Sequence, residues 1–332
     1  MTPQQSLGQS LGSYLSSTPP HAGAIVQLKG LNVPPPQVKG SATLPLSVLD
    51  QTQVFTAVGL LGKRSGQFLI DTGASTTMLS AALVKALQLQ GRPVPGDKLA
   101  SAVAGNECSS MNATLHTLPT LRFQTVEVKG LSGLKFESTV IPEGLSGVLG
   151  MDVLGRFDLQ LHPQARTLKL TAPTPLPIAA ADQAVPLQKK LGVFLAKLTM
   201  NGQGPFTLLL DTGADSTFIS EEVAARIKLD PKNREPIQIQ GFCGLEPATR
   251  SRLATLKLYQ HEQNNLEAIV LTSSILKLLG VDGILGQNFL QHYQQYWRFT
   301  PAVVRSSRAD GSLLLSPIPV PSGIAPKAAP NR

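Results

Sequence analysis

The chain has 332 residues, of which 42% are hydrophobic and 5% are aromatic. This length accommodates two globular domains with separate cores, and the composition excludes a disordered or fibrous protein. The 29 Lys and Arg residues exceed the 21 Asp and Glu residues by a net charge of +8. The basic residues are scattered and not interleaved with aromatic ones, so we expect no nucleic-acid partner.

The first residues and the cysteines exclude further classes. The start, MTPQQSLGQSLGSYLSS, lacks the basic and apolar regions of a secretory signal, and no apolar run is long enough to span a bilayer. We therefore expect no membrane partner and, by default, a cytoplasmic protein, although a removed leader would leave the same sequence. Cys108 and Cys243 lack the spacing of a zinc site, and the five histidines show no metal-ligand spacing, so we expect neither a metal nor a cofactor.

The first half of the chain opens with an extension, residues 1–41, which we expect to be flexible because it offers little to a core. Residues 42–171 form the first predicted lobe. There VFTAVGLL and GQFLI are strand-like, and GKRSG between them has the residues of a hairpin turn. The second strand runs into Asp-Thr-Gly at 71–73. A short helix over 80–89 and the segment LSGVLGMDVLGRF at 145–157 follow.

The same order of elements then repeats. Residues 172–183, rich in Pro and Ala, form a predicted linker, and residues 184–316 form a second predicted lobe. This lobe contains the strand VFLAKLTM, the motif DTGADSTFIS, a helix over 220–229 and the segment VDGILGQNFLQHY at 281–293. Residues 317–332 are an expected flexible tail. Two copies of one fold are therefore predicted, and a symmetric packing of the copies would bring Asp71 and Asp211 together.

A single Asp-Thr-Gly could be only a turn that ends a strand, because Asp and Gly are common turn residues. Here both strands before the Asp are apolar, FLI and LLL, which suggests burial and makes a charged side chain costly unless it has a use. The whole context also occurs twice. The pair is therefore a stronger signal of a catalytic site than either motif alone.

These motifs, DTGAS and DTGAD with GVLGMD and GILGQN downstream, closely resemble the retropepsin-like aspartic peptidases. The resemblance covers most of residues 42–171 and 184–316 and implies an all-β fold of two β-barrel lobes about a pseudo-twofold axis. Each lobe would carry a short helix after its Leu-Gly support element. Retroviral members are homodimers with one motif per subunit, so this chain looks like a tandem form that acts as a monomeric pseudo-dimer.

The resemblance implies an aspartic endopeptidase that hydrolyses peptide bonds of a protein or peptide substrate with a water held between Asp71 and Asp211. Two carboxylates in contact share a proton, so one can act as base and the other as acid. The active-site loops would be supported by Thr72, Gly73, Ala74, Thr212, Gly213 and Ala214. By resemblance, the threonines would join the two loops by hydrogen bonds, and the glycines would let the backbone approach the carboxylates.

The family also places a β-hairpin flap over the substrate, and the matching segments are SAVAGNECSSMNATL at 101–115 and IQIQGFCGLEPATRSRL at 237–253. Flap tips that meet would bring Cys108 and Cys243 close enough for a disulfide; two free thiols are the alternative. The candidate substrate-binding residues, from position alone, are Ser75, Asp215, Gly105, Asn106, Gly241 and Phe242. The exchange of Ser75 for Asp215 is the main difference between the motifs.

Three alternatives remain open at this level. The chain could be an inactive peptide-binding or assembly module of the same fold, although two intact motifs argue against this. It could be a basic nucleic-acid-binding scaffold, which rests on net charge alone. It could also be a homodimer in which each half pairs with its twin from another chain.

Overall fold

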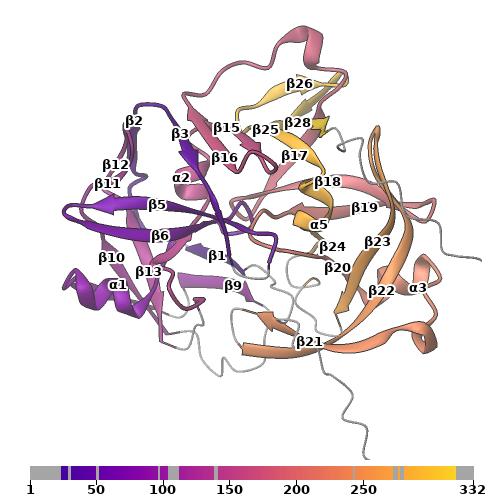
Figure 1. Ribbon diagram of the computed structural model, residues 1–332, viewed down its shortest axis with the longest axis horizontal. Coiled ribbons are helices and arrows are strands. Elements are labelled where there is room, and N and C mark those ends of the chain that lie inside the picture. The colour runs from indigo at the N-terminus through magenta and orange to yellow at the C-terminus, as the bar shows by residue number, and fades with distance from the viewer. Residues whose placement is uncertain are drawn as a thin grey trace, which may run out of the picture.

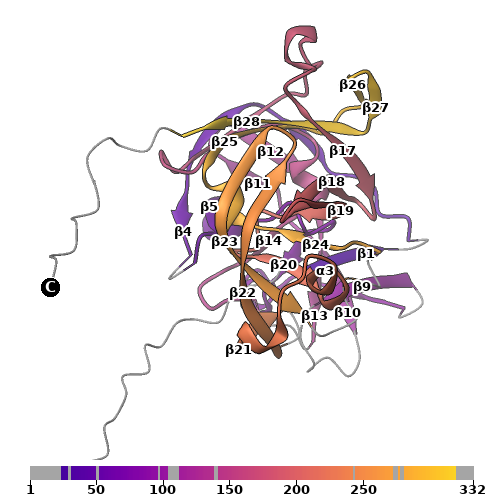
Figure 2. The same cartoon turned by 90° about the vertical axis from the view of Figure 1, so that its right-hand side faces the viewer.

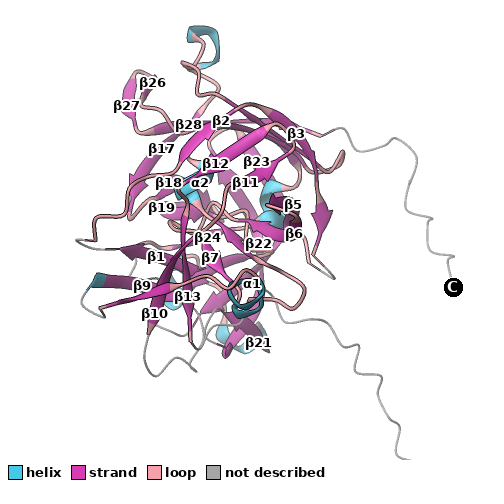
Figure 3. Ribbon diagram, turned by 90° about the vertical axis from the view of Figure 1, so that its left-hand side faces the viewer, coloured by secondary structure: helices cyan, strands magenta, loops and turns pink. Residues whose placement is uncertain are grey.

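The computed structural model describes residues 24–28, 31–49, 52–95, 98–103, 112–137, 141–241, 244–271, 276 and 280–318. Most of these residues lie in strands, with few and short helices (Figure 3). Two large curled sheets dominate, and in Figure 1 the first half of the chain lies on the left and the second half on the right. The predicted fold class, an all-β protein with two barrel-like lobes, is confirmed.

The first half contains the strands β1 Ala24–Leu28, β2 Gln37–Lys39, β3 Ala42–Pro45, β4 Ser47–Val48, β5 Phe55–Leu61, β6 Arg64–Ile70, β7 Met78–Leu79, β8 Gly91–Val94, β9 Leu99–Val103, β10 Ala113–Thr117, β11 Leu121–Phe123, β12 Val126–Lys129, β13 Ser132–Phe136, β14 Gly147–Leu149, β15 Asp158–His162 and β16 Thr167–Thr171. Its helices are α1 Ala81–Ala86 and α2 Met151–Leu154.

The second half contains the strands β17 Val185–Lys190, β18 Val193–Met200, β19 Gln203–Leu210, β20 Thr217–Ser220, β21 Glu235–Gly241, β22 Gly244–Leu258, β23 His261–Leu271, β24 Gly283–Leu285, β25 Tyr293–Arg298, β26 Ala302–Val304, β27 Ser307–Ala309 and β28 Gly311–Pro317. The helices with described bounds in this half are α3 Glu221–Arg226 and α5 Gln287–Leu290, and short 3-10 turns lie at η2 Ile178–Ala180 and η3 Pro231–Asn233.

A hairpin leads into each Asp-Thr-Gly motif: β5 pairs with β6, and β18 pairs with β19. The first residues of β6 and β19 are exposed, but their last three residues are fully buried. β6 lies between β5 and the parallel strand β14, and β19 lies between β18 and the parallel strand β24, so both strands are central in their sheets. The opposite faces of β6 pack into two core clusters, which contain Phe68 and Ile70 on one face and Leu69 on the other. Continuous apolar runs such as FLI and LLL are typical of strands buried on both faces.

Glycine is required where the support strands, β14 and β24, pass close to β7 and β20. A Cβ atom at Gly147 would lie 2.2 Å from the carbonyl oxygen of Met78, and a Cβ at Gly283 would lie 2.3 Å from that of Phe218. No side chain fits at such distances, so only glycine lets β14 and β24 pass this close to β7 and β20. The repeated Gly-aliphatic-aliphatic-Gly pattern is therefore a packing requirement.

The predicted helix after each motif is present but shorter than expected. Ser80 and Ser220 cap α1 and α3, and their hydroxyl oxygens accept hydrogen bonds of 3.2 Å from Leu83 N–H and Val223 N–H. Both helices are followed within two residues by a residue with positive φ, Gln88 at 50° and Lys228 at 59°. This left-handed conformation ends an α-helix.

The two halves are joined by a shared sheet. Strands β3, β16 and β15 of the first half continue through β25 into β28 and β17 of the second half. At the junction Leu159 faces Trp297 across β15 and β25, and Leu161 faces Gln295. Trp297 is only 1% exposed and belongs to a core cluster that contains residues of both halves. The interface between the halves is thus part of the hydrophobic core.

Some segments expected to carry little structure contain hydrogen-bonded elements. Within the predicted extension, β1 pairs antiparallel with β9 over five residues and β2 pairs with β12. Within the predicted linker lies the 3-10 turn η2, and Ile318 N–H at the start of the predicted tail donates to His292 O at 3.0 Å. Composition did not reveal these elements because sheet pairing depends on a partner strand distant in sequence. Figure 2 shows β28 along the upper edge of the molecule, with its paired strand β25 beside it.

Among the described residues, none of the helices combines the length and apolar character needed to cross a bilayer.

Candidate active site

The two Asp-Thr-Gly turns meet between the lobes. Asp71 follows β6 and its N–H donates to Leu149 O at 3.2 Å; Asp211 follows β19 and its N–H donates to Leu285 O at 3.0 Å. The support strands β14 and β24 therefore fix the backbone at the two catalytic Asp residues. Both side chains are buried, with 2% of Asp71 and none of Asp211 exposed.

The two carboxylates contact each other, and each also lies against the glycine of the opposite turn. A Cβ atom at Gly73 would lie 2.3 Å from Oδ2 of Asp211, and one at Gly213 would lie 2.4 Å from Cγ of Asp71. Burial raises the pKa of Asp71 well above its ordinary value, and the charge of Asp211 and a hydrogen bond with it raise that pKa further. Burial also raises the pKa of Asp211. The pair therefore holds a shared proton more tightly than two separate carboxylates would.

Backbone amides orient each carboxylate. Oδ1 of Asp71 accepts hydrogen bonds from Gly73 N–H at 2.7 Å and Ala74 N–H at 3.0 Å, and Oδ1 of Asp211 accepts one from Gly213 N–H at 2.8 Å. These bonds stabilise the charged form and lower the pKa values, although burial outweighs them. Oδ2 of Asp211 is buried and accepts from none of the described donor groups, which leaves it available for the shared proton.

Four reciprocal hydrogen bonds join the turns. Thr72 N–H donates to Thr212 Oγ1 at 3.1 Å, and Thr212 N–H donates to Thr72 Oγ1 at 3.1 Å. The Thr72 hydroxyl donates to Leu210 O at 2.9 Å, and the Thr212 hydroxyl donates to Ile70 O at 2.8 Å. All four bonds are buried and cross from one half to the other. The threonines therefore occupy the positions expected of residues that lock the turns together.

The first residues of the short helices α2 and α5 form hydrogen bonds with the two Asp-Thr-Gly turns. Met151 N–H donates to Ala74 O at 2.7 Å, and Gln287 N–H donates to Ala214 O at 2.8 Å. The buried amide of Gln287 also donates to Thr212 O at 3.3 Å. The sequence predicted a short helix after each Leu-Gly element but not these polar contacts, although the difference between GMD and GQN is visible in the sequence.

Ser75 and Asp215 lie at equivalent, partly buried positions beyond the two turns. The turn between β17 and β18 approaches Ser75: a Cβ atom at Gly192 would lie 2.8 Å from Cβ of Ser75. Asp215 O accepts a hydrogen bond of 2.9 Å from Asn288 N–H. A role of either residue in substrate binding stays a prediction.

The strand pairing around the predicted flaps differs between the lobes. In the second lobe, β21 and β22 form a hairpin whose register runs from Glu235 opposite Arg250 to Gly241 opposite Gly244. In the first lobe, β9 pairs with β1, whereas β10 pairs with β8 and β13. Among the described residues, β9 pairs with β1 and not with β10, and residues 104–111 of the expected first flap lie outside the described residues, so this flap stays a prediction. The flap candidates Gly105, Asn106, Cys108, Phe242 and Cys243 lie outside the described residues, and so does the proposed disulfide.

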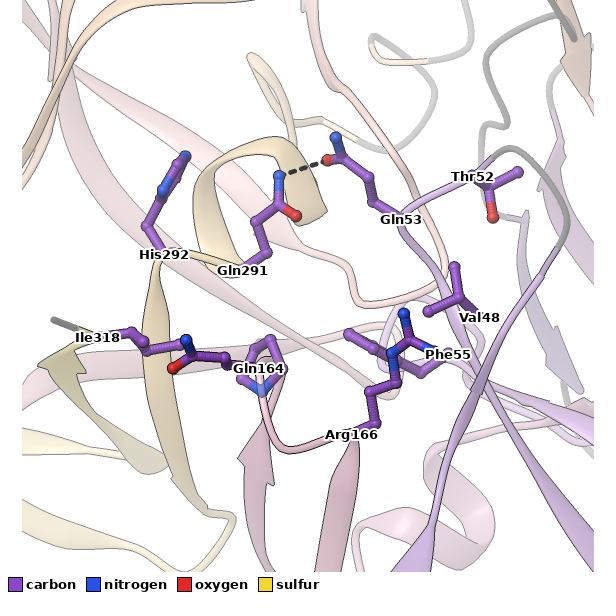
Figure 4. Close-up of a pocket in the computed structure, with 10 residues that line it drawn as sticks. Val48, Thr52, Gln53, Phe55, Gln164, Arg166, Gln291, His292 and Ile318 are labelled. Carbon is purple, nitrogen blue, oxygen red and sulfur yellow. Dashed lines mark hydrogen bonds between the residues drawn. The ribbon is translucent and has the colours of Figure 1, made fainter. Parts of the chain in front are cut away.

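A separate pocket of about 480 Å³ lies at the junction of the lobes (Figure 4). It is lined by residues of both halves, and across its rim the Gln291 amide donates to Gln53 Oε1 at 2.7 Å. None of its lining residues belongs to an Asp-Thr-Gly turn. The pocket is therefore distinct from the carboxylate pair.

The family model described as gag-polyprotein putative aspartyl protease matches residues 57–156 and 196–292. The chain belongs to this family. The two matches together cover more than half of the chain. Each aspartyl protease match extends from the strand hairpin before an Asp-Thr-Gly turn to the end of the support helix or just beyond it, so the family occurs twice in tandem. A search of curated proteins found no match.

Proposed function

We propose that the protein is an aspartic endopeptidase that hydrolyses peptide bonds with a water activated between Asp71 and Asp211. The observation that carries this proposal is the contact between two buried carboxylates with raised pKa values, one from each half of the same chain. A buried pair with no other use would destabilise the fold, so its retention points to catalysis.

The geometry supplies a base and an acid in one site. The ionised member of the pair takes a proton from the water as the water oxygen attacks the scissile carbonyl carbon. The protonated member donates to the carbonyl oxygen, which gives a neutral tetrahedral diol. The protonated member then transfers its proton to the leaving nitrogen while the ionised member takes a proton from one hydroxyl of the diol. The C–N bond breaks, the carbonyl of the carboxylic acid product forms, and the pair again holds one shared proton. The amides of Gly73 and Gly213 keep one oxygen of each carboxylate oriented during these transfers.

The active unit is proposed to be the single chain. The reciprocal threonine bonds and the pairing of β15 with β25 are all formed within one polypeptide. A pairing of each half with its twin from a second chain would have to replace these buried contacts.

The decisive experiment is cleavage of a diverse peptide pool between about pH 3 and about pH 8 by the wild type and by Asp71→Asn and Asp211→Asn. Either substitution alone should abolish cleavage, because each removes one half of the pair. Activity of about half the wild-type level in either single variant would instead support pairing of like halves between chains. A wild type that binds peptides but cleaves none would support the binding-module alternative.

A further inference from the structure

The two lobes support their catalytic turns with different chemistry. In the first lobe, Asp152 of α2 accepts hydrogen bonds from Thr77 N–H at 2.9 Å and from the Thr77 hydroxyl at 2.7 Å, and Val153 N–H donates to the same carboxylate at 3.0 Å. In the second lobe, the equivalent residues are Asn288 and Thr217. A carboxylate therefore stands where the other copy has a neutral amide.

The amide network of the second lobe satisfies itself without a charge. The Thr217 hydroxyl donates to Asn288 Oδ1 at 2.7 Å, and Asn288 Nδ2 donates to Glu267 O at 2.8 Å. Neither side chain titrates in the physiological range. The chain thus contains its own uncharged reference for the first lobe.

The carboxylate network of the first lobe is connected directly to the turn that bears Asp71. Thr77 Oγ1 accepts a hydrogen bond of 3.2 Å from Gly150 N–H, and the next amide, Met151 N–H, donates to Ala74 O at 2.7 Å. A Cβ atom at Gly150 would lie 2.8 Å from Ala74 O. Hydrogen bonds therefore fix both ends of the segment from Asp71 to Thr77, and those at Thr77 are made by Asp152 and Gly150.

The groups that face the Asp152 carboxylate are uncharged. They are the Thr77 backbone and hydroxyl from the turn and the amides at the start of α2, and among the described ion pairs none includes Asp152. Burial raises the pKa of Asp152 to about 6, and the hydrogen bonds from Thr77 and Val153 lower it only in part. Asp152 consequently changes charge close to neutrality.

We propose that Asp152 is a positioning residue for Asp71 and that its protonation rearranges the hydrogen bonds at Thr77, so that the contacts supporting the first catalytic turn respond to pH and the equivalent Asn288 contacts of the second turn do not. The ionised carboxylate accepts three hydrogen bonds. Addition of one proton from solvent to Oδ1, on the side that faces Thr77, converts this acceptor site into an O–H donor, and the Thr77 hydroxyl can no longer donate there. The hydroxyl then accepts from Asp152 as well as from Gly150 N–H, and its own proton loses its partner.

The test uses Asp152→Asn, which gives the first lobe the amide of the second, and the reciprocal Asn288→Asp as the matched control. Carboxyl carbon NMR across about pH 4 to about pH 8 follows Asp152 and both members of the pair. In the wild type, the Asp71 signal should show an inflection at the pH where Asp152 titrates. Asp152→Asn should remove this inflection, and Asn288→Asp should create one in the Asp211 signal.

Unfolding provides a second readout. The folded-state pKa of about 6 exceeds the ordinary value of 3.8, so the wild type should gain stability relative to Asp152→Asn as the pH falls through 6. The difference of about 2 pKa units corresponds to a change of about 100-fold in the ratio of the two folding equilibrium constants. Equal pH dependence of the two proteins, or an Asp71 inflection that survives Asp152→Asn, would overturn the proposal.

The catalytic consequence rests on the proposed function. If the protein cleaves peptides, Asp152→Asn should alter the pH profile of kcat near pH 6 and leave KM nearly unchanged, because Asp152 contacts the turn and not the peptide. If the protein cleaves none, the proposed function fails, whereas the NMR and unfolding measurements still decide whether Asp152 positions Asp71.

Discussion

Replacement of Thr212 by valine should destabilise the whole molecule, because this side chain supports the other half of the chain. The Thr212 hydroxyl donates to Ile70 O and accepts from Thr72 N–H, and both partners are buried backbone groups. Valine has nearly the same shape but leaves both groups without a hydrogen bond. Each unsatisfied buried group costs about 1–3 kcal/mol, so Thr212→Val should lower the free energy of unfolding by about 2–6 kcal/mol.

Urea unfolding, followed by tryptophan fluorescence, would measure this loss, because the single tryptophan, Trp297, lies at the strand junction between the halves. Thr212→Ser is the matched control: it keeps the hydroxyl and removes one methyl group, for a cost of about 1 kcal/mol. The double variant Thr72→Val/Thr212→Val should cost more than either single variant, because each hydroxyl makes two of the four bonds and none is shared between the two side chains. Equal stability of Thr212→Val and Thr212→Ser would refute the reasoning.

Three further predictions follow from the site and the core. Because the pKa of Asp71 is raised in the folded state, the stability that its protonation provides is complete in acid and is lost as the pH rises through the folded-state pKa. Asp71→Asn should therefore melt at a higher temperature than the wild type at neutral pH and lose this advantage in acid. A difference in melting temperature between the two proteins that is the same at every pH would contradict this. Gly73→Ala places a Cβ atom 2.3 Å from Asp211 Oδ2 and should abolish cleavage, with a loss of about 1–3 kcal/mol in the free energy of unfolding. The control is Gly130→Ala, which reports backbone strain alone, because φ is positive there but no atom lies within 4 Å of the new Cβ. Comparable cleavage activity of the two variants would exclude the steric argument. Trp297→Ala should cost about 3–5 kcal/mol and Trp297→Phe much less, and calorimetry should show one unfolding transition in the wild type because the core spans both halves; two well-separated wild-type transitions would show that the halves unfold independently.

The local features of the site followed from sequence because each depends on neighbouring residues. The apolar strand before each Asp, the serine cap and the glycine that permits a close approach are encoded within about ten positions of each motif. The bounds of α1 and α3 were less accurate, since the left-handed residues Gln88 and Lys228 that end them are not glycines. The pairing of β1 with β9 also escaped prediction, because the two strands lie about 75 residues apart and composition carries no register information.

The sequence by itself determined that the chain holds two copies of one β fold and that Asp71 and Asp211 are equivalent, because a repeat of this width constrains both copies to similar packing. Only the tertiary structure decided what joins the copies. The threonine bonds and the sheet through β15 and β25 form between residues about 140 positions apart, and the contact that raises the Asp71 pKa exists only after they form. The sequence shows Asp152 where the second copy has Asn288, but only the tertiary structure decided that this carboxyl group is buried against Thr77, and its pKa depends on that removal from water.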